Sequence, residues 1–232
     1  MFIKWLFDRL VALIGLLFLW PVLLVVAIMV KIKMPDGPAF FVQKRVGKGG
    51  KTFNCHKFRT MMVKPTLVPS LKGREESVSN GWSTVSVAGD LRITPFGATL
   101  RHYKLDELPG LWDVLIGNMS FVGPRPDVPG YADKLQGEDR DVLRLRPGIT
   151  GPATLKYRLE DEMIAEYVAK KQAEGDTRPM QEIAIEYNDN VIYPDKVRLN
   201  CYYYRHYSFW KDIEMIFATV LGFKVKFAGE EV

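Results

Sequence analysis

Residues 105–126 read LDELPGLWDVLIGNMSFVGPRP, and this stretch decides most of what the sequence predicts. Two carboxylates, Asp106 and Glu107, stand where a helix is expected to begin. Pro109 suits the first turn of that helix because proline has no N–H group to donate. Apolar residues then recur at helical spacing, and a glycine follows as the expected C-cap: Leu108, Leu111, Trp112, Leu115, Ile116 and then Gly117.

Each end of this stretch carries charge that suits phosphate or metal chemistry. A carboxylate in the first turn of a helix lies near free N–H groups and the positive end of the helix dipole, which favours its charged form. Asp106 and Glu107 are therefore candidates for a nucleophile or a metal ligand. The stiff turn at residues 123–126 presents Arg125 as an anion-binding fork. Acidic pairs also serve as ordinary helix caps, and Pro-Arg-Pro also occurs in surface turns, so neither signal is specific alone.

The composition is that of a globular protein with unevenly distributed charge. At 232 residues the chain is long enough for one domain with a buried core, and 47% hydrophobic residues is an ordinary share for such a domain. Between residues 31 and 64, nine lysines and arginines stand against one acid, Asp36. This block suits an anionic membrane surface, a phosphorylated ligand or nucleic acid. Cys55 and Cys201 match no paired metal or redox spacing, which argues against a disulfide framework.

The N-terminal segment is predicted to hold the chain in a membrane. No charged residue occurs from Leu10 to Val30, which is about the length that crosses a hydrocarbon core as a helix. Pro21 lies within this run and predicts a kink. Positive charges flank both ends of the run: Lys4 and Arg9 before it, Lys31 and Lys33 after it. A re-entrant helix that turns back at Pro21 would put all four on one side of the membrane, and a kinked spanning helix is the alternative.

A β-hairpin is predicted over residues 40–57, where two strand-like runs flank a glycine-rich turn. Lys57 and Arg59 stand two positions apart at its end, and extended backbone would place both cations on one face. We expect both to bind substrate phosphate, although a solvated basic strand has the same pattern. Residues 65–92 lack helical periodicity and are predicted to form a loop that is mobile without ligand.

A helix is predicted to start at Thr94-Pro95, with Thr94 as N-cap and Pro95 in the first helical position. This helix would present Arg101 shortly before the acidic pair, where it could bind a substrate phosphate or Asp106. A plain surface arginine is the alternative. Further on, residues 138–144 predict a short helix.

The turn that follows this short helix offers another cation. Glycines at 148 and 151 predict a tight turn, and Arg146 stands at its mouth as a further anion-binding fork. The polar helix predicted over residues 160–171 carries no assigned chemistry.

The C-terminal part, residues 195–226, combines aromatic and basic residues. An apolar stripe at helical spacing follows them: Ile213, Ile216, Phe217, Val220 and Leu221. Aromatic residues and cations at one edge of an apolar stripe are typical of a helix that lies at a membrane interface. Ordinary core burial is the alternative.

With these motifs assembled, the chain resembles the monotopic phosphoglycosyl transferases of the bacterial sugar transferase family. The matching segments span nearly the whole chain: the apolar run with Pro21, residues 57–61 (KFRTM), Arg101 with residues 105–109 (LDELP), residues 119–126 (MSFVGPRP), residues 146–151 (RPGITG) and Tyr202-Tyr203. Their joint order and spacing make the resemblance specific. The chain departs from the usual family pattern at four positions: Trp20, Asn118, Pro152 and Asn200.

The resemblance implies an α+β fold in two parts. Residues 1–33 would form a re-entrant helix hairpin in the bacterial inner membrane, broken near Trp20 and Pro21. Residues 34–232 would form a small, mostly helical catalytic domain on the cytoplasmic face, with a β-hairpin and interfacial amphipathic helices. Membrane lipid is thus an expected partner, and a homodimer is compatible with the sequence.

The resemblance also implies an activity. Family members transfer a sugar 1-phosphate from a UDP-sugar to polyprenyl (undecaprenyl) phosphate and release UMP. The family's catalytic pair falls on Asp106, as nucleophile, and Glu107, with Mg²⁺ expected near Asp106. The expected substrate-binding residues are Lys57, Arg59, Arg101, Pro124, Arg125, Pro126 and Arg146.

The chemistry of the residues supports this activity independently. Two polyanionic substrates that approach each other must be screened, which a divalent ion and several cations can do. Neighbouring helical residues point about 100° apart, so Asp106 and Glu107 cannot flank one bond as a glycosidase pair does. One can attack phosphorus while the other assists, which divides one displacement into two steps.

Three other kinds of protein are alternatives to this hypothesis. A membrane-tethered module that binds anionic lipid or a partner protein without catalysis also explains the apolar run and the basic block. It does not explain why the acidic pair occurs together with three arginine-bearing turns. We expect no nucleic-acid partner, because no recognition motif accompanies the basic block. The polytopic sugar-phosphate transferases are excluded, since they need many apolar runs and this sequence has one.

Overall fold

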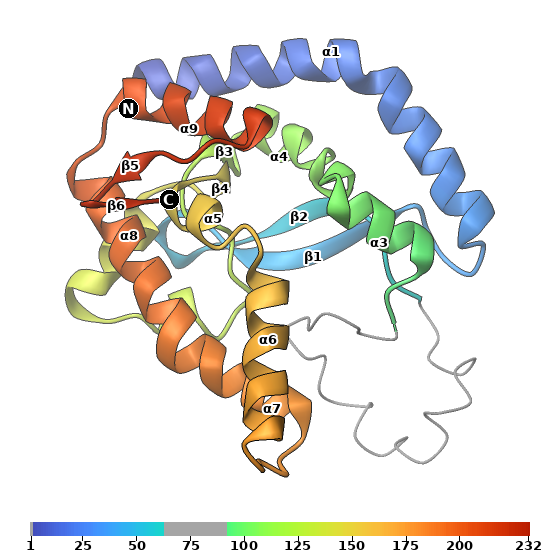
Figure 1. Cartoon of the computed structure of the whole chain (residues 1–232). Coiled ribbons are helices and arrows are strands. Elements are labelled where there is room, and N and C mark those ends of the chain that lie inside the picture. The colour runs from blue at the N-terminus through green and yellow to red at the C-terminus, as the bar shows by residue number, and fades with distance from the viewer. Residues whose placement is uncertain (1, 63–91) are drawn as a thin grey trace.

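The computed structural model describes residues 2–62 and 92–232, so almost all of the loop predicted at 65–92 lies outside the described residues. The fold mixes helices and strands (Figure 1). The helices are α1 Phe2–Lys33, α3 Pro95–His102, α4 Gly110–Ile116, α5 Pro152–Lys156, α6 Glu160–Ala173, α7 Met180–Tyr187, α8 Tyr193–Arg205 and α9 Phe209–Leu221. Shorter helical turns are η1 Lys48–Gly50, η4 Leu105–Glu107, η5 Ala132–Lys134, η6 Gly137–Arg144 and the π-helical η7 Asn188–Ile192.

The strands form three separate two-stranded sheets in the described part of the chain. Strands β1 (Phe40–Val46) and β2 (Thr52–Phe58) are antiparallel, from Phe40 opposite Phe58 to Val46 opposite Thr52. Strands β3 (Ser120–Val122) and β4 (Gly148–Thr150) are parallel. Strands β5 (Lys226–Phe227) and β6 (Glu230–Glu231) are antiparallel. The predicted hairpin is therefore confirmed as β1–β2.

Helix α1 runs without interruption through Pro21 (Figure 1). It bends part-way along and arches over one end of the molecule, so the kink is present within a single helix rather than between two helices. Proline explains a bend, because it cannot donate to the carbonyl one turn earlier. Among the described residues, α1 is the one helix long and apolar enough to cross a membrane, and only 11% of its most apolar window is buried. Trp20 and Pro21 both lie on its exposed surface.

Both ends of α1 contact the same globular part of the chain. Near its start, Lys4 forms a 2.6 Å ion pair with Asp212 of α9. At its end, Val30 and the following Met34 pack with Phe58 and Leu100 in one buried cluster. The helix is thus fixed at its two ends by contacts that involve α9 on one side and β2 and α3 on the other.

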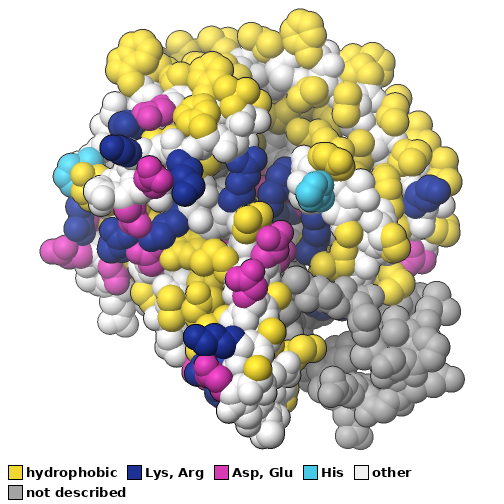
Figure 2. All heavy atoms as spheres, viewed as in Figure 1, with side chains coloured by type: hydrophobic (Ala, Val, Ile, Leu, Met, Phe, Trp, Pro, Cys, Tyr) yellow, Lys and Arg dark blue, Asp and Glu magenta, His cyan; other side chains and the backbone are white. Residues whose placement is uncertain are grey.

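Helix α9 lies beneath the N-terminal half of α1 (Figure 1). Its inner face is buried through Met215 and Ala218, both 0% exposed. Much of the predicted apolar stripe instead faces outward: Phe217, Val220 and Leu221 are 56%, 75% and 69% exposed. Core burial of that whole stripe is therefore wrong. Figure 2 shows apolar side chains gathered along the α1 edge, with lysines and arginines in a band below it.

Helix α3 begins as predicted. The side chain of Thr94 accepts a hydrogen bond from the backbone N–H of Gly97 at 2.9 Å, and Pro95 opens the helix. Gly97 packs directly against the chain at Thr60, where a Cβ would come within 2.0 Å of a carbonyl oxygen. This contact holds α3 against the end of β2 and so places the acidic pair that follows α3.

The main core lies between α8, α9 and the short sheets, around the fully buried Tyr203, Leu199 and Met215. Helices α6 and α7 pack on each other through a separate cluster that includes Ile164 and Ile183, and they project from the end of the molecule opposite α1 (Figure 1). The helices predicted at 138–144 and 160–171 are confirmed as η6 and α6, although η6 is a 3₁₀ helix.

Candidate active site

The acidic pair lies on the short turn η4, not in the first turn of α4. Helix α4 begins at Gly110, and Pro109 precedes it as the N-cap residue, so the predicted helix start was three residues too early. Lys104, which precedes η4, adopts a left-handed backbone with φ 54°. A non-glycine residue pays about 1 kcal/mol or more for this conformation, and such strain is common at functional sites. The left-handed residue redirects the chain between α3 and η4 and so aims the two carboxylates.

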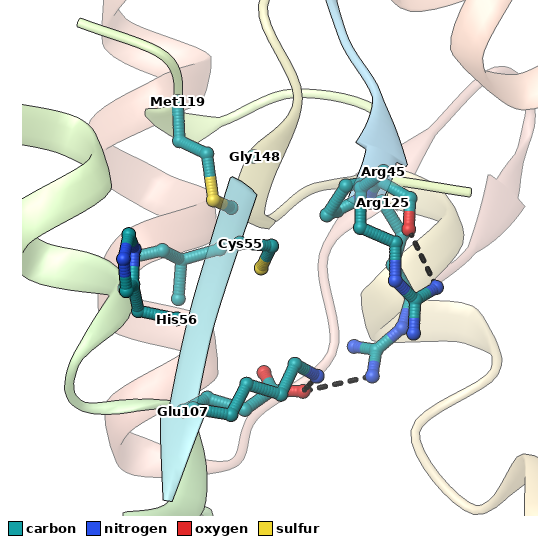
Figure 3. A pocket seen from close by; sticks show the side chains of 11 residues that line it. Arg45, Cys55, His56, Glu107, Met119, Arg125 and Gly148 are labelled. Carbon is teal, nitrogen blue, oxygen red and sulfur yellow. Dashed lines mark hydrogen bonds and ion pairs between the residues drawn. The ribbon is translucent and has the colours of Figure 1, made fainter. Parts of the chain in front are cut away.

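Glu107 is held by two cations. Its Oε1 accepts hydrogen bonds from Lys57 Nζ and from Arg125 Nη2, each at 2.8 Å (Figure 3). Burial acts to raise the pKa of Glu107, but Arg125 and Lys57 outweigh burial and bring the pKa well below its usual range. Glu107 is therefore ionised, as predicted, because of these two cations rather than because of a helix dipole.

Asp106 has a different environment. The residue is 8% exposed, and its carboxylate makes no hydrogen bond or ion pair with any residue that the structure describes. Burial and then the neighbouring Glu107 raise the pKa of Asp106, and Lys57, Arg101 and Arg125 oppose that shift. This direction is opposite to the one expected from a helix start. The oxygens of Asp106 are thus bonded by no described residue, while the charges of Lys57, Arg101 and Arg125 act on its carboxylate.

The Pro-Arg-Pro turn holds Arg125 beside Glu107. The carbonyl of Pro124 accepts the N–H of Gly148 at 2.8 Å, and the carbonyl of Pro126 accepts Arg45 Nη1 at 3.0 Å. A Cβ on Gly123 would lie 2.4 Å from the carbonyl oxygen of Arg146, so only glycine allows this close approach. Pro124 and Pro126 therefore fix the turn through their carbonyls, and Arg125 supplies the charge.

The other three arginines predicted to bind substrate lie in different places. Arg101 donates to Thr60 Oγ1 at 3.0 Å and acts electrostatically on Asp106, so it belongs to the site. Arg59 does not lie beside Lys57, because β2 ends at Phe58 and the backbone turns.

The side chain of Arg59 holds the connection between α1 and β1. Arg59 is 4% exposed and donates to the carbonyls of Met34 and Pro38 and to Asp36. Arg146 lies near Arg9 and Asp8 of α1 instead of near Glu107. The structure thus brings Lys57, Arg101 and Arg125 to the acidic pair, and it separates Arg59 and Arg146 from it.

Comparison with known proteins identifies the family. The sequence model described as Bacterial sugar transferase matches residues 1–225. The chain belongs to the bacterial sugar transferase family. A UDP-N-acetylgalactosamine-undecaprenyl-phosphate N-acetylgalactosaminephosphotransferase of Aeromonas hydrophila is 32% identical over 222 residues, which cover 94% of this chain and 43% of that protein.

Two further relatives extend this comparison. A UDP-glucose:undecaprenyl-phosphate glucose-1-phosphate transferase of Xanthomonas campestris pv. campestris is 33% identical over 227 residues, 95% of this chain and 39% of that protein. The exopolysaccharide production protein ExoY of Sinorhizobium fredii is 30% identical over 216 residues, 92% of this chain and 82% of that protein. The chain thus spans about two fifths of the length of the first two relatives.

This bacterial sugar transferase has side chains that fit a magnesium ion at the acidic pair. Mg²⁺ is usually held by one or two carboxylates together with water and substrate phosphates. Asp106 offers oxygens that no described residue occupies, and Glu107 adjoins it in an ionised state. No group of three or more acidic, histidine or cysteine side chains suited to a metal occurs in the described parts of the chain. A metal here would therefore depend on substrate phosphate and water for its remaining ligands.

Arg45 is a site residue that sequence reasoning missed. It lines a cavity of about 20 Å³ together with Arg125, Lys57 and Glu107 (Figure 3). That volume suits a single water molecule. Burial, and next the charge of Arg125, lower the pKa of Arg45. Arg45 lies near the end of β1 and donates to Pro126 in the Pro-Arg-Pro turn, a contact between distant parts of the chain that the local sequence does not predict.

The start of α6 lies near the site, although no sequence pattern assigned chemistry to it. Glu160 accepts Lys196 Nζ at 2.7 Å and acts electrostatically on Arg125. Burial raises the pKa of Asp161, and the charge of Arg101 opposes that shift, so Asp161 lies within electrostatic range of Arg101. These carboxylates belong to the described surroundings of the acidic pair, and only the packing of α6 brings them there.

Proposed function

We propose that this protein transfers a sugar 1-phosphate from a UDP-sugar to undecaprenyl phosphate, with release of UMP, through a covalent intermediate on Asp106. One observation carries the proposal: Asp106 is a buried carboxylate that no described residue bonds, next to a Glu107 whose Oε1 already accepts from Lys57 and Arg125. The names of the relatives from Aeromonas hydrophila and Xanthomonas campestris, which specify this class of donor and acceptor, support the assignment.

The two carboxylates have separate roles in this proposal. An oxygen of Asp106 attacks the β-phosphorus of the donor, the bond from that phosphorus to the oxygen of UMP breaks, and UMP leaves with the electron pair. A phosphate oxygen of undecaprenyl phosphate then attacks the same phosphorus, and the bond to Asp106 breaks and restores the carboxylate. A raised pKa makes the ionised Asp106 a stronger nucleophile, while Glu107 holds Lys57 and Arg125 where the transferred phosphate must be screened.

Asp106 and Glu107 are the residues that would hold Mg²⁺. A bound magnesium ion supplies charge neutralisation for the phosphate oxygens of the donor. The chain itself contributes Lys57, Arg101 and Arg125, whose charges act on Asp106.

The acceptor explains why the site is attached to α1. We propose that both ends of α1 lie on the cytoplasmic side of the inner membrane, with the helix embedded in one leaflet. An α-helix of 32 residues would be about 48 Å long if straight, which would put its ends on opposite sides of a bilayer. The contacts of Lys4 with Asp212 and of Met34 with Phe58 instead join both ends to one globular body. The exposed apolar residues of α9 support an interface-lying position.

The test is a panel of UDP-sugars incubated with the purified full chain, undecaprenyl phosphate and magnesium, with UMP release as the readout. We expect one or a few donors to release UMP over many turnovers when the acceptor is present, and at most one UMP per chain when it is absent. The matched variant is Asp106→Asn, which keeps the size of the side chain and removes the nucleophile. Membrane binding without UMP release from any donor would favour the non-catalytic tethered module instead.

A further inference from the structure

Arg9 of α1 presents a guanidinium that the protein only partly satisfies. Its Nη2 donates to the carbonyl of Ile116, at the C-terminal end of α4, across 3.3 Å in an exposed contact. Its guanidinium lies 4.2 Å from the ring centre of Trp5. Its Nε is buried and has no hydrogen-bond partner among the described residues. Among the described residues, the bond to Ile116 is thus the one hydrogen bond of Arg9, and most of its donors have no protein acceptor.

The pairing of β3 with β4 brings Arg146 to the same place. Ser120 lies opposite Gly148, and the N–H of Ser120 donates to the carbonyl of Pro147 at 2.8 Å. Arg146 precedes Pro147 in the chain, so it lies near Ser120, which follows the C-terminal end of α4. No described residue makes a hydrogen bond or ion pair with its half-buried side chain. Asp8, which precedes Arg9, accepts from Ser120 Oγ at 2.7 Å, so Ser120 contacts a sequence neighbour of each arginine. In keeping with this placement, burial and next the charge of Arg9 lower the pKa of Arg146.

The charge at this position is not balanced by the protein. Asp8 is the carboxylate near both arginines, but it is 3% exposed and accepts hydrogen bonds from Ser120 Oγ at 2.7 Å and from the N–H of Phe121 at 3.4 Å. Two guanidiniums thus share one carboxylate that is already occupied. Like charges held together in a half-buried position favour an anion that bridges them.

The surroundings indicate which anion. The neighbouring face of α1 consists of exposed apolar side chains: Phe2, Ile3, Leu6, Leu10 and Leu13. Cations at the polar edge of an apolar helix face are where lipid phosphates lie. The acidic pair is at the other end of α4, and this helix of seven residues is about 10 Å long, so the arginines are distinct from the catalytic phosphates.

We propose that Arg9 and Arg146 together bind the headgroup phosphate of a phospholipid from the surrounding bilayer. The bound headgroup would fix the depth of α1 and, through Ile116, the position of α4. This site rests on the location of α1 in a bilayer and does not depend on the catalytic assignment of Asp106.

The experiment measures lipid binding and needs no turnover. The full chain, purified in a maltoside detergent, is titrated with dioleoylphosphatidylglycerol or with dioleoylglycerol, which has the same acyl chains and no phosphate. The readout is the thermal unfolding temperature. We expect the phospholipid to raise it and dioleoylglycerol to leave it unchanged. In Arg9→Gln/Arg146→Gln, the concentration of phospholipid that gives half of the shift should rise at least tenfold.

Two further variants keep the test specific. Lys33→Gln removes one positive charge from the opposite, exposed end of α1 and should respond like the wild type. Arg146→Lys retains the charge and should keep most of the response. If the double variant does not remain monodisperse, Arg146→Gln alone is titrated, with at least a threefold rise expected, because the contact of Arg9 with Ile116 is then intact.

Three results would overturn the proposal. One is an equal phospholipid response in the wild type and in the arginine variants. Another is equal stabilisation of the wild type by dioleoylglycerol. The third is an unchanged phospholipid response together with a raised KM for undecaprenyl phosphate, which would assign the two arginines to the acceptor substrate.

Discussion

Lys4 and Asp212 lie 208 positions apart in the sequence and form an ion pair at 2.6 Å in which both side chains are almost completely buried. The hydroxyl of Tyr203 donates to the same carboxylate. The first turns of α1 are thereby joined to α8 and α9. A membrane helix that merely anchored the protein would need no such pairing with the globular part.

Replacement of Lys4 by methionine should destabilise the protein by about 3 kcal/mol, because Asp212 would be left charged in a buried position. Thermal or denaturant unfolding in detergent measures the change. The double variant Lys4→Met/Asp212→Asn should recover much of the loss, and Lys33→Met, at the exposed end of α1, should have little effect. A Lys4→Met protein as stable as the wild type would show that the pair does not hold α1.

The same contacts predict that the two ends of α1 are on one side of the membrane. Single cysteines at residue 1 and at the exposed Pro35 would be introduced into a protein in which Cys55 and Cys201 are replaced by alanine. A membrane-impermeant thiol reagent added to inverted inner-membrane vesicles, which expose the cytoplasmic face, should label both positions. Labelling of only one of them before the vesicles are opened would establish a spanning helix.

Glu107→Gln should lower both stability and transfer, because it removes the charge that Lys57 and Arg125 share. The cluster is partly exposed, so we expect a loss of about 2 kcal/mol rather than the larger value for a fully buried pair. The pKa of Glu107 is lowered in the folded state, so its contribution is present above the unfolded pKa, about 4.3, and disappears at lower pH. Unfolding at pH 7 and at acid pH tests this: a difference between the variant and the wild type that persisted unchanged in acid would contradict the assignment.

Asp106→Asn should abolish transfer and stabilise the protein. The pKa of Asp106 is raised in the folded state, so the fold disfavours its ionised form, and this cost applies above that pKa and vanishes as the pH falls. A gain of about 1 kcal/mol at pH 7 would raise the unfolding temperature by about 2–4 °C for a chain of this size. Asp113→Asn is a useful contrast, because Asp113 is fully buried but bonds His56 at 2.8 Å and 2.9 Å, and its loss should destabilise. Destabilisation by Asp106→Asn would mean that Asp106 has a structural partner.

Local sequence signals predicted the elements that depend on neighbouring residues. The hairpin β1–β2, the N-cap at Thr94 and the C-cap at Gly117, which has φ 86°, were all confirmed. Each is determined by a few adjacent residues whose backbone preferences are strong. The sequence pattern singled out the acidic pair but did not predict the short turn η4 on which it lies. The left-handed backbone before η4 occurs at Lys104, where no glycine signals it.

The positions of cations depended on tertiary contacts and were predicted less well. Lys57 and Arg125 meet at Glu107, as expected. The prediction placed the side chain of Arg59 on the same face as that of Lys57, because side chains two positions apart share a face of a strand. Strand β2 ends at Phe58, so this rule does not extend to Arg59. Arg146 was misplaced because its neighbour, Arg9, comes from the other end of the chain. Contacts between distant parts of the chain, which local patterns do not report, thus decide which of these cations lie at the acidic pair.

The measurement closest to the central claim is a direct search for sugar phosphate on the polypeptide. The purified full chain is incubated with a productive UDP-sugar carrying ³²P at the β-phosphate, with magnesium and without acceptor, and is then quenched in acid and digested for mass spectrometry. The account predicts a labelled peptide containing Asp106, loss of the label when undecaprenyl phosphate is added, and no label in Asp106→Asn. Transfer to undecaprenyl phosphate at full rate by Asp106→Asn, or turnover with label never found on the wild-type chain, would contradict it.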